Sequence, residues 1–169
     1  MLRTPRLAFS VVLGLAIAAS GILTVTAQPQ TCGLLTSDEI QALAPNQNVT
    51  SAEVSTNQGG GAVTCRYEWG AGNQHFTLAL SVQPAARMFV GMSADSIKQY
   101  MQRVVTPETS DESIPDVGEA AFFKSFSPVY ATASAYVKDR VLQVTLDGID
   151  APDRKGQLIA LLKSAASRL

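Results

Sequence analysis

Short segments that alternate apolar and polar residues constrain the fold of this chain most strongly. In residues 62–69 every second side chain is large and apolar or a cysteine, namely Cys65, Tyr67 and Trp69. Residues 74–83 alternate in the same way, and the glycine-rich residues 70–73 join the two segments. Successive side chains of a strand point to opposite faces of a sheet, and such turns are typical of hairpins. The pattern predicts an antiparallel sheet with one buried face.

The same criteria predict six strands and three helices. The strands are expected over residues 49–56, 62–69, 74–83, 122–125, 129–137 and 140–147. Helices are expected over residues 37–44, 84–104 and, after a cap at 150–153, to residue 168. Gly91 leaves the alternative that the second helix begins only at an N-cap, Ser93.

The predicted order of elements is a helix, three strands, a helix, three strands and a helix. The fold class is therefore α+β, with a mainly antiparallel sheet in two α-β-β-β-like halves and with helices that cover one face. Because the halves share no detectable residue identity, an origin by duplication stays open. Two local signals support the boundaries: a capping box from Thr36 to Glu39, and a tight turn at Lys138-Asp139.

The first 27 residues have the layout of a secretory signal peptide. Arg3 and Arg6 precede an apolar run over residues 7–27, which ends in the small-residue site Val25-Thr26-Ala27. We expect residues 1–27 to be removed and residues 28–169 to form a single exported α+β domain, periplasmic or secreted. The alternative is an uncleaved membrane anchor, because about 20 apolar residues can span a bilayer.

Charge excludes one class of partner. The chain has 13 basic and 14 acidic residues, and two of the basic residues but none of the acidic ones lie in the first 27. Removing that segment changes the net charge from −1 to −3. An acidic domain without clustered basic residues argues against nucleic-acid binding. No later segment approaches 18 consecutive apolar residues, so we expect no membrane span after cleavage of the signal.

Cys32 and Cys65 are the only cysteines. An even number of cysteines in a chain expected to enter an oxidising compartment predicts one disulfide. A redox thiol would need a C-x-x-C spacing or a nearby histidine, and a zinc site would need three or four ligands. The disulfide therefore has a structural role, tying the first helix to the buried side of a strand.

The remaining polar residues do not form a recognisable catalytic or metal site. His75 is the only histidine and is expected on the polar face of a strand. Asp147, Asp150 and Asp153 lack the spacing of a calcium loop. Acidic residues between Glu108 and Glu119 fit a solvated loop. We predict no catalytic residue, no cofactor and no metal, and therefore no enzyme.

Two tyrosines suggest a binding surface. Tyr130 and Tyr136 share one face of their strand with Thr132 and Ser134, whereas the opposite face carries small residues suited to packing under a helix. The tyrosines are then expected to point outward, and tyrosine is enriched at interfaces. The alternative interpretation is that they only shield the sheet.

Three segments resemble a known family: Cys32-Gly33-Leu34-Leu35-Thr36-Ser37-Asp38-Glu39-Ile40, Cys65-Arg66-Tyr67, and residues 114–122 around Gly118. They are similar to small exported bacterial proteins and lipoproteins of unknown function that begin C-x-L-L-T-x-x-E, carry a second cysteine before an aromatic residue, and later show a glycine turn before a strand. The resemblance implies a cell-envelope or secreted protein without an established activity. This chain lacks the lipobox cysteine that lipid anchoring requires.

The function expected from the sequence is a non-catalytic exported domain that binds a protein or a cell-envelope component through an exposed sheet face. One alternative is a secreted inhibitor of an extracellular enzyme, which rests on fold analogy alone. Another is a hydrolase that uses carboxylates of the acidic loop and would need a pocket there.

Overall fold

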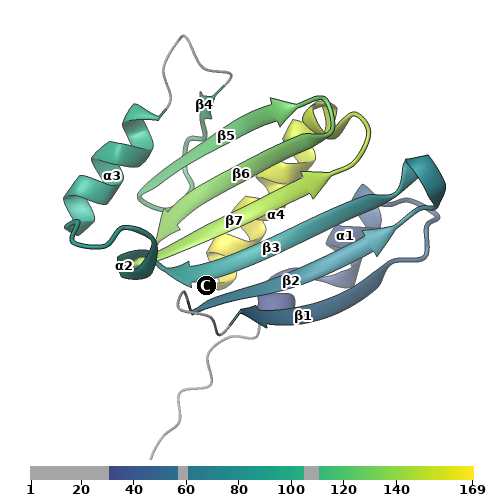
Figure 1. The fold of residues 1–169 in the computed structure, drawn as a ribbon, viewed down its shortest axis with the longest axis horizontal. Coiled ribbons are helices and arrows are strands. Elements are labelled where there is room, and N and C mark those ends of the chain that lie inside the picture. The colour runs from purple at the N-terminus through teal and green to yellow at the C-terminus, as the bar shows by residue number, and fades with distance from the viewer. Residues whose placement is uncertain (1–30, 57–60, 105–110) are drawn as a thin grey trace, which may run out of the picture.

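The computed structural model describes residues 31–56, 61–104 and 111–169. Within them, seven strands form one antiparallel sheet in the order β1-β2-β3-β7-β6-β5-β4 (Figure 1). The strands are β1 (Thr50–Thr56), β2 (Ala62–Trp69), β3 (Phe76–Pro84), β4 (Glu112–Ser113), β5 (Ala120–Ser127), β6 (Tyr130–Val137) and β7 (Arg140–Asp147). The α-helices are α1 (Ser37–Leu43), α2 (Ala85–Met88), α3 (Ala94–Arg103) and α4 (Lys155–Arg168), and the 3-10 helices are η1 (Thr31–Leu34), η2 (Gly72–Gln74) and η3 (Ala151–Arg154). The predicted α+β class is confirmed.

The seventh strand is the short edge strand β4. Its two residues pair with β5, Glu112 opposite Phe123 and Ser113 opposite Phe122. The sequence predicts a loop here, because two residues are too few to show an alternating pattern. Pairing with a strand already in place creates β4.

The two halves of the sheet meet at its centre. Strands β1, β2 and β3 form one meander, β5, β6 and β7 form the other, and β3 pairs with β7 with Leu80 opposite Val144. Each meander therefore contributes its third strand to the middle of the sheet. The two predicted three-strand groups are confirmed.

One face of the sheet is covered by α1 and α4, which lie behind it in Figure 1. Leu158 and Leu162 of α4 are fully buried in the same cluster as Leu80, Leu142 and Val144. Strand β6 meets α4 with three alanines that are also fully buried: Ala131, Ala133 and Ala135. Small side chains let the helix approach closely, as the alternation in β6 predicts.

The disulfide joins the N-terminal segment to this core. Cys32 lies in η1 and Cys65 in β2, with Cα atoms 5.1 Å apart. The Tyr67 hydroxyl donates to the Cys32 carbonyl oxygen at 3.2 Å. Cys65 is fully buried, so the predicted bridge to the buried side of the strand is confirmed.

Helix α1 begins at the predicted capping box. The Glu39 amide donates to Thr36 Oγ1 at 3.2 Å, and the Thr36 amide donates to Glu39 Oε2 at 2.7 Å. The Glu39 carboxylate also accepts hydrogen bonds from both terminal nitrogens of Arg168, at the end of α4, at 2.7 and 2.9 Å. The Arg168 guanidinium holds the pKa of Glu39 at about 2, with a smaller contribution from the Thr36 amide and against the opposing effect of burial.

The helix expected over residues 84–104 is divided in two. Gly91 has a φ of 78°, a left-handed conformation that suits glycine, and Ser93 caps α3 by accepting from the Ser96 amide at 3.2 Å. Ile97 and Met101 of α3 pack in a second cluster with Tyr136, on the face opposite α4. The helices therefore cover parts of both faces rather than one, which corrects that part of the prediction.

Two tight turns follow the sequence signals. Lys138 and Asp139 have φ values of 48° and 60°, the left-handed pair of a two-residue hairpin turn. Gly118 has a φ of 56°, and a β-carbon there would clash with the Tyr136 carbonyl oxygen. By contrast, Asp150 makes no side-chain cap, and α4 begins only at Lys155 after η3.

Some sequence predictions lie outside the described residues. These are the signal peptide over residues 1–27 and the part of the acidic loop that lies in residues 105–110, which includes Glu108. In the part of the chain that the structure describes, no helix has the length and apolar character needed to cross a membrane.

Candidate binding groove on the open sheet face

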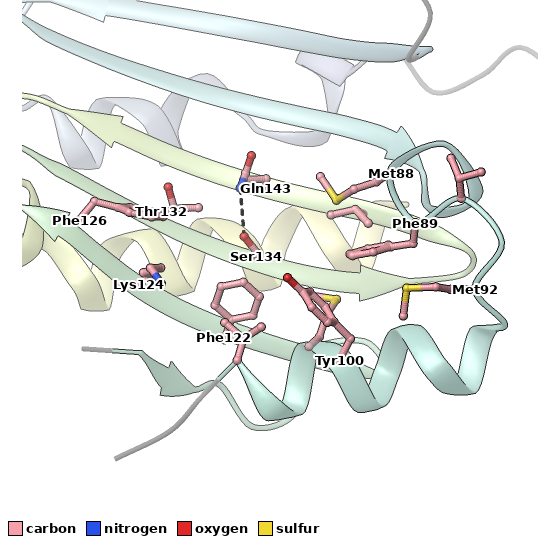
Figure 2. A pocket seen from close by; sticks show the side chains of 14 residues that line it. Met88, Phe89, Met92, Tyr100, Phe122, Lys124, Phe126, Thr132, Ser134 and Gln143 are labelled. Atoms are coloured by element: carbon pink, nitrogen blue, oxygen red, sulfur yellow. Dashed lines mark hydrogen bonds between the residues drawn. The ribbon is translucent and has the colours of Figure 1, made fainter. Parts of the chain in front are cut away.

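An apolar groove of about 590 Å³ lies on the sheet face that α4 does not cover. Strands β5, β6 and β7 form its floor, and α2, α3 and the turn between them form its wall (Figure 2). Its lining residues are Met88, Phe89, Val90, Met92, Tyr100, Met101, Val104, Phe122, Lys124, Phe126, Thr132, Ser134, Val141 and Gln143. The volume lies within the range of about 300–1,000 Å³ that is usual for small-molecule sites.

Methionine and aromatic side chains make the wall apolar and adaptable. Phe89 and Tyr100 meet edge to face with ring centroids 5.5 Å apart. Phe122 reaches toward Tyr100 from the floor, and Met88 and Met92 stand at the end formed by the turn (Figure 2). Methionine is flexible and polarisable, and it is common at surfaces that bind varied apolar ligands.

The floor carries a small number of polar groups. Gln143 Nε2 donates to Ser134 Oγ at 3.3 Å, in the middle of the groove (Figure 2). Further along, the hydroxyls of Thr132 and Thr145 are 3.1 Å apart. These groups come from alternating residues on one face of β6 and β7, so the sheet register positions them.

Lys124 and Phe126 form the end opposite the turn (Figure 2). The Lys124 ammonium lies 3.1 Å from Asp111 Oδ2 and 5.1 Å from the centroid of the Phe126 ring. The Asp111 side chain is fully buried, and its Oδ1 has no hydrogen-bond partner. An ammonium has three N–H donors, so Lys124 can serve a ligand while it neutralises Asp111.

The two tyrosines expected to face outward have different environments. Tyr130 is 37% exposed and packs edge to face on Phe126, with centroids 5.5 Å apart. Tyr136 is only 1% exposed, because α3 covers it, so its expected outward position is wrong. The Tyr136 hydroxyl donates to Asp139 Oδ1 at 2.7 Å; this bond, with burial as the second cause, raises the pKa of Tyr136 to about 12.

The other polar candidates do not converge. His75 is exposed between η2 and β3, away from the groove lining. Among the described residues, Asp147, Asp150 and Asp153 belong to no group of three or more metal-ligating side chains. Glu119 lies near the β6–β7 turn, where its Oε1 accepts from the Lys138 amide at 3.1 Å.

A second cavity of about 610 Å³ lies between the end of α1 and the β2–β3 connection, with a mixed polar lining. There Trp69 stacks on Phe76 at 5.6 Å between centroids, and Arg154 lies 4.8 Å from the Phe76 centroid. Arg154 Nη1 donates to the Leu43 carbonyl oxygen at 2.6 Å. This arginine caps α1, so its geometry is explained by the fold.

The alternation in β6 predicts that Thr132 and Ser134 share one sheet face, but it does not predict the groove that α2, α3 and their turn form over that face. Residues 88–92 contain four large apolar side chains around Gly91, a run too short to show a period. The sequence signal that could have indicated the groove is this apolar run beside the helix break at Gly91.

Neither a family model, nor a curated protein, nor a solved structure was found to match this chain.

Proposed function

We propose that this chain is a non-catalytic exported domain that binds the apolar chain of a cell-envelope molecule in the groove between α3 and the sheet. The groove itself carries the proposal: it is concave, its lining is mostly methionine, aromatic and aliphatic, and it is open to solvent. Water in such a groove is displaced favourably by an apolar ligand.

The composition of the groove favours an acyl-type chain over a strongly polar ligand. Ser134 and Gln143 hydrogen-bond to each other on the floor, so each of these polar side chains already has one partner within the fold. The methionines of α2, α3 and their turn can adapt to chains of different length. Export, expected from the sequence, would bring the domain to the compartment where such molecules occur.

A fluorescent stearate that carries an anthroyloxy group tests this function. We expect saturable binding to the domain with one site per chain, and competition by unlabelled fatty acid. Gln143→Trp, which places a large ring on the groove floor, should weaken binding at least tenfold. Thr77→Trp is the matched control, because Thr77 is equally half-buried on the same face of the sheet but outside the groove.

The result that overturns the proposal is equally specific. Wild type, Gln143→Trp and Thr77→Trp must all be folded by circular dichroism. If they then bind the labelled stearate with equal affinity, the probe is bound outside the groove. Absence of saturable binding to the wild type would reject an acyl-chain ligand.

A further inference from the structure

The turn between α2 and α3 exposes apolar side chains that the fold does not use. Val90 is 84% exposed, and Met88 and Met92 beside it are also exposed. Gly91, with its φ of 78°, holds the turn in a tight bend, and the Met92 amide donates to the Phe89 carbonyl oxygen at 3.1 Å. Val90 is therefore presented on a defined bend next to the short helix α2.

The charge of this segment differs from that of the whole domain. Residues 85–104 contain three basic side chains, Arg87, Lys98 and Arg103, and one acidic side chain, Asp95, whose Oδ1 lies 3.8 Å from the Lys98 ammonium; the segment keeps a net charge of +2. Residues 28–169 as a whole are acidic. A protruding apolar tip with a local excess of positive charge complements an anionic lipid surface, where apolar residues enter the interface and basic residues meet head groups.

We infer that the α2–α3 turn docks the domain on an anionic membrane surface, with Val90 inserted between lipids and Arg87 and Lys98 at the head groups. The turn forms one end of the groove, opposite Lys124 and Phe126 (Figure 2). Docking there places this end of the groove at the membrane, so an acyl chain can pass from the bilayer into the groove. The docking step itself does not depend on the proposed function. Only the identity of the molecule that enters the groove rests on that function.

Flotation with lipid vesicles tests the docking step. Wild-type protein should float with vesicles of phosphatidylcholine mixed with phosphatidylglycerol, and much less with phosphatidylcholine alone. Raising the salt concentration should release it, because salt screens exposed charges. Val90→Asp should lower vesicle binding at least tenfold. Ile149→Asp is the matched control, since Ile149 is 41% exposed on another loop, and it should bind like wild type.

A pair of charge variants separates docking from groove binding. Arg87→Glu with Lys98→Glu should lose vesicle binding at least tenfold and keep its affinity for the labelled stearate, because neither residue lines the groove. Arg66→Glu with Lys163→Glu makes the same change in net charge away from the turn. This control should leave vesicle binding and stearate affinity unchanged. Gln143→Trp should show the reverse pattern, with vesicle binding kept and stearate binding lost.

The inference is overturned if wild type does not float with anionic vesicles, or if Val90→Asp floats as well as Ile149→Asp. If stearate binding is retained in that case, only the docking inference is rejected, and the proposed function of the groove is still supported. Cross-linking of the turn to an envelope protein, without flotation of the wild type, would also reject the lipid surface in favour of a protein partner.

Discussion

The two faces of the sheet differ in how completely helices cover them. On one face α4 packs along β6 and β7, where the alanines of β6 let it approach and the leucines of α4 are fully buried. On the other face α3 contacts the sheet mainly at β5 and is anchored by Ile97 and Met101. The same strands therefore build a closed core on one side and an open groove on the other. Stability is concentrated where helices fit the sheet, and binding is available where they do not.

Removing the disulfide should produce the largest loss of stability, on the closed face. Bridging about 34 residues stabilises a fold by about 3.5 to 4 kcal/mol in the chain-entropy account. Cys32→Ser with Cys65→Ser should lower the free energy of unfolding by that amount, measured by urea denaturation. Wild type in reductant serves as the control. If the double variant and the oxidised wild type unfold at the same urea concentration, η1 and the packing of Tyr67 hold the N-terminal segment in place without the disulfide.

Truncating α4 tests the closed face by packing alone. Leu162 is fully buried against the sheet. Leu162→Ala should cost about 3 kcal/mol, because it removes apolar contacts and leaves a cavity. Thermal unfolding followed by circular dichroism measures the loss. A cost below about 1 kcal/mol would mean that α4 is no better packed than the helices of the groove face.

The ion pair between α1 and α4 should make the closed face sensitive to acid. The pKa of Glu39 is lowered from 4.5 to about 2 by Arg168, so its stabilising contribution is present above about pH 4.5 and disappears as the pH falls toward 2. Glu39→Gln should cost about 1.5 kcal/mol at pH 7, because glutamine can keep the capping box but loses the charge-assisted bonds to Arg168. Urea unfolding at several pH values should show the two proteins converging in acid. A constant difference across this range would contradict the assignment.

On the groove face, Tyr136 should contribute less. Tyr136→Phe removes the hydrogen bond to Asp139 and should cost about 1 kcal/mol near neutral pH. Because the bond raises the pKa of Tyr136 to about 12, its contribution should decline as the pH rises from 10 toward 12. Denaturation at alkaline pH checks both statements. Tyr130→Phe, at the more exposed tyrosine of the same face, is the matched control.

The smallest effect on stability should come with a large effect on binding. Tyr100 is 51% exposed and lines the groove. Tyr100→Ala should cost about 0.5 kcal/mol of stability, the value of an exposed aromatic pair, and weaken labelled stearate about tenfold. Fluorescence titration and thermal unfolding of one sample measure both. A stability loss above 2 kcal/mol would instead assign this wall of the groove to the core.

Local signals predicted most of the elements because each depends on neighbouring residues. The alternation in β2 and β3, the capping box at Thr36 and the left-handed turn at Lys138-Asp139 reflect strand geometry, helix-end hydrogen bonds and backbone sterics. The disulfide was predictable because the chain has only two cysteines. The strand β4 was missed, since its pairing depends on β5 rather than on its own two residues.

The groove depends on where distant elements pack. Sequence patterns determine that β6 has a small-residue face and a face with tyrosines, but not which helix covers either face. Tyr136 was expected to be exposed because its strand alternates, and it is buried because α3 crosses that end of the sheet. The packing of Ile97 and Met101 in the second cluster holds α3, and with it the α2–α3 turn, at the groove. Local chemistry therefore specified the strands, turns and covalent bridge, whereas burial against non-local partners, which supplies most of the free energy of packing, decided which face stayed open.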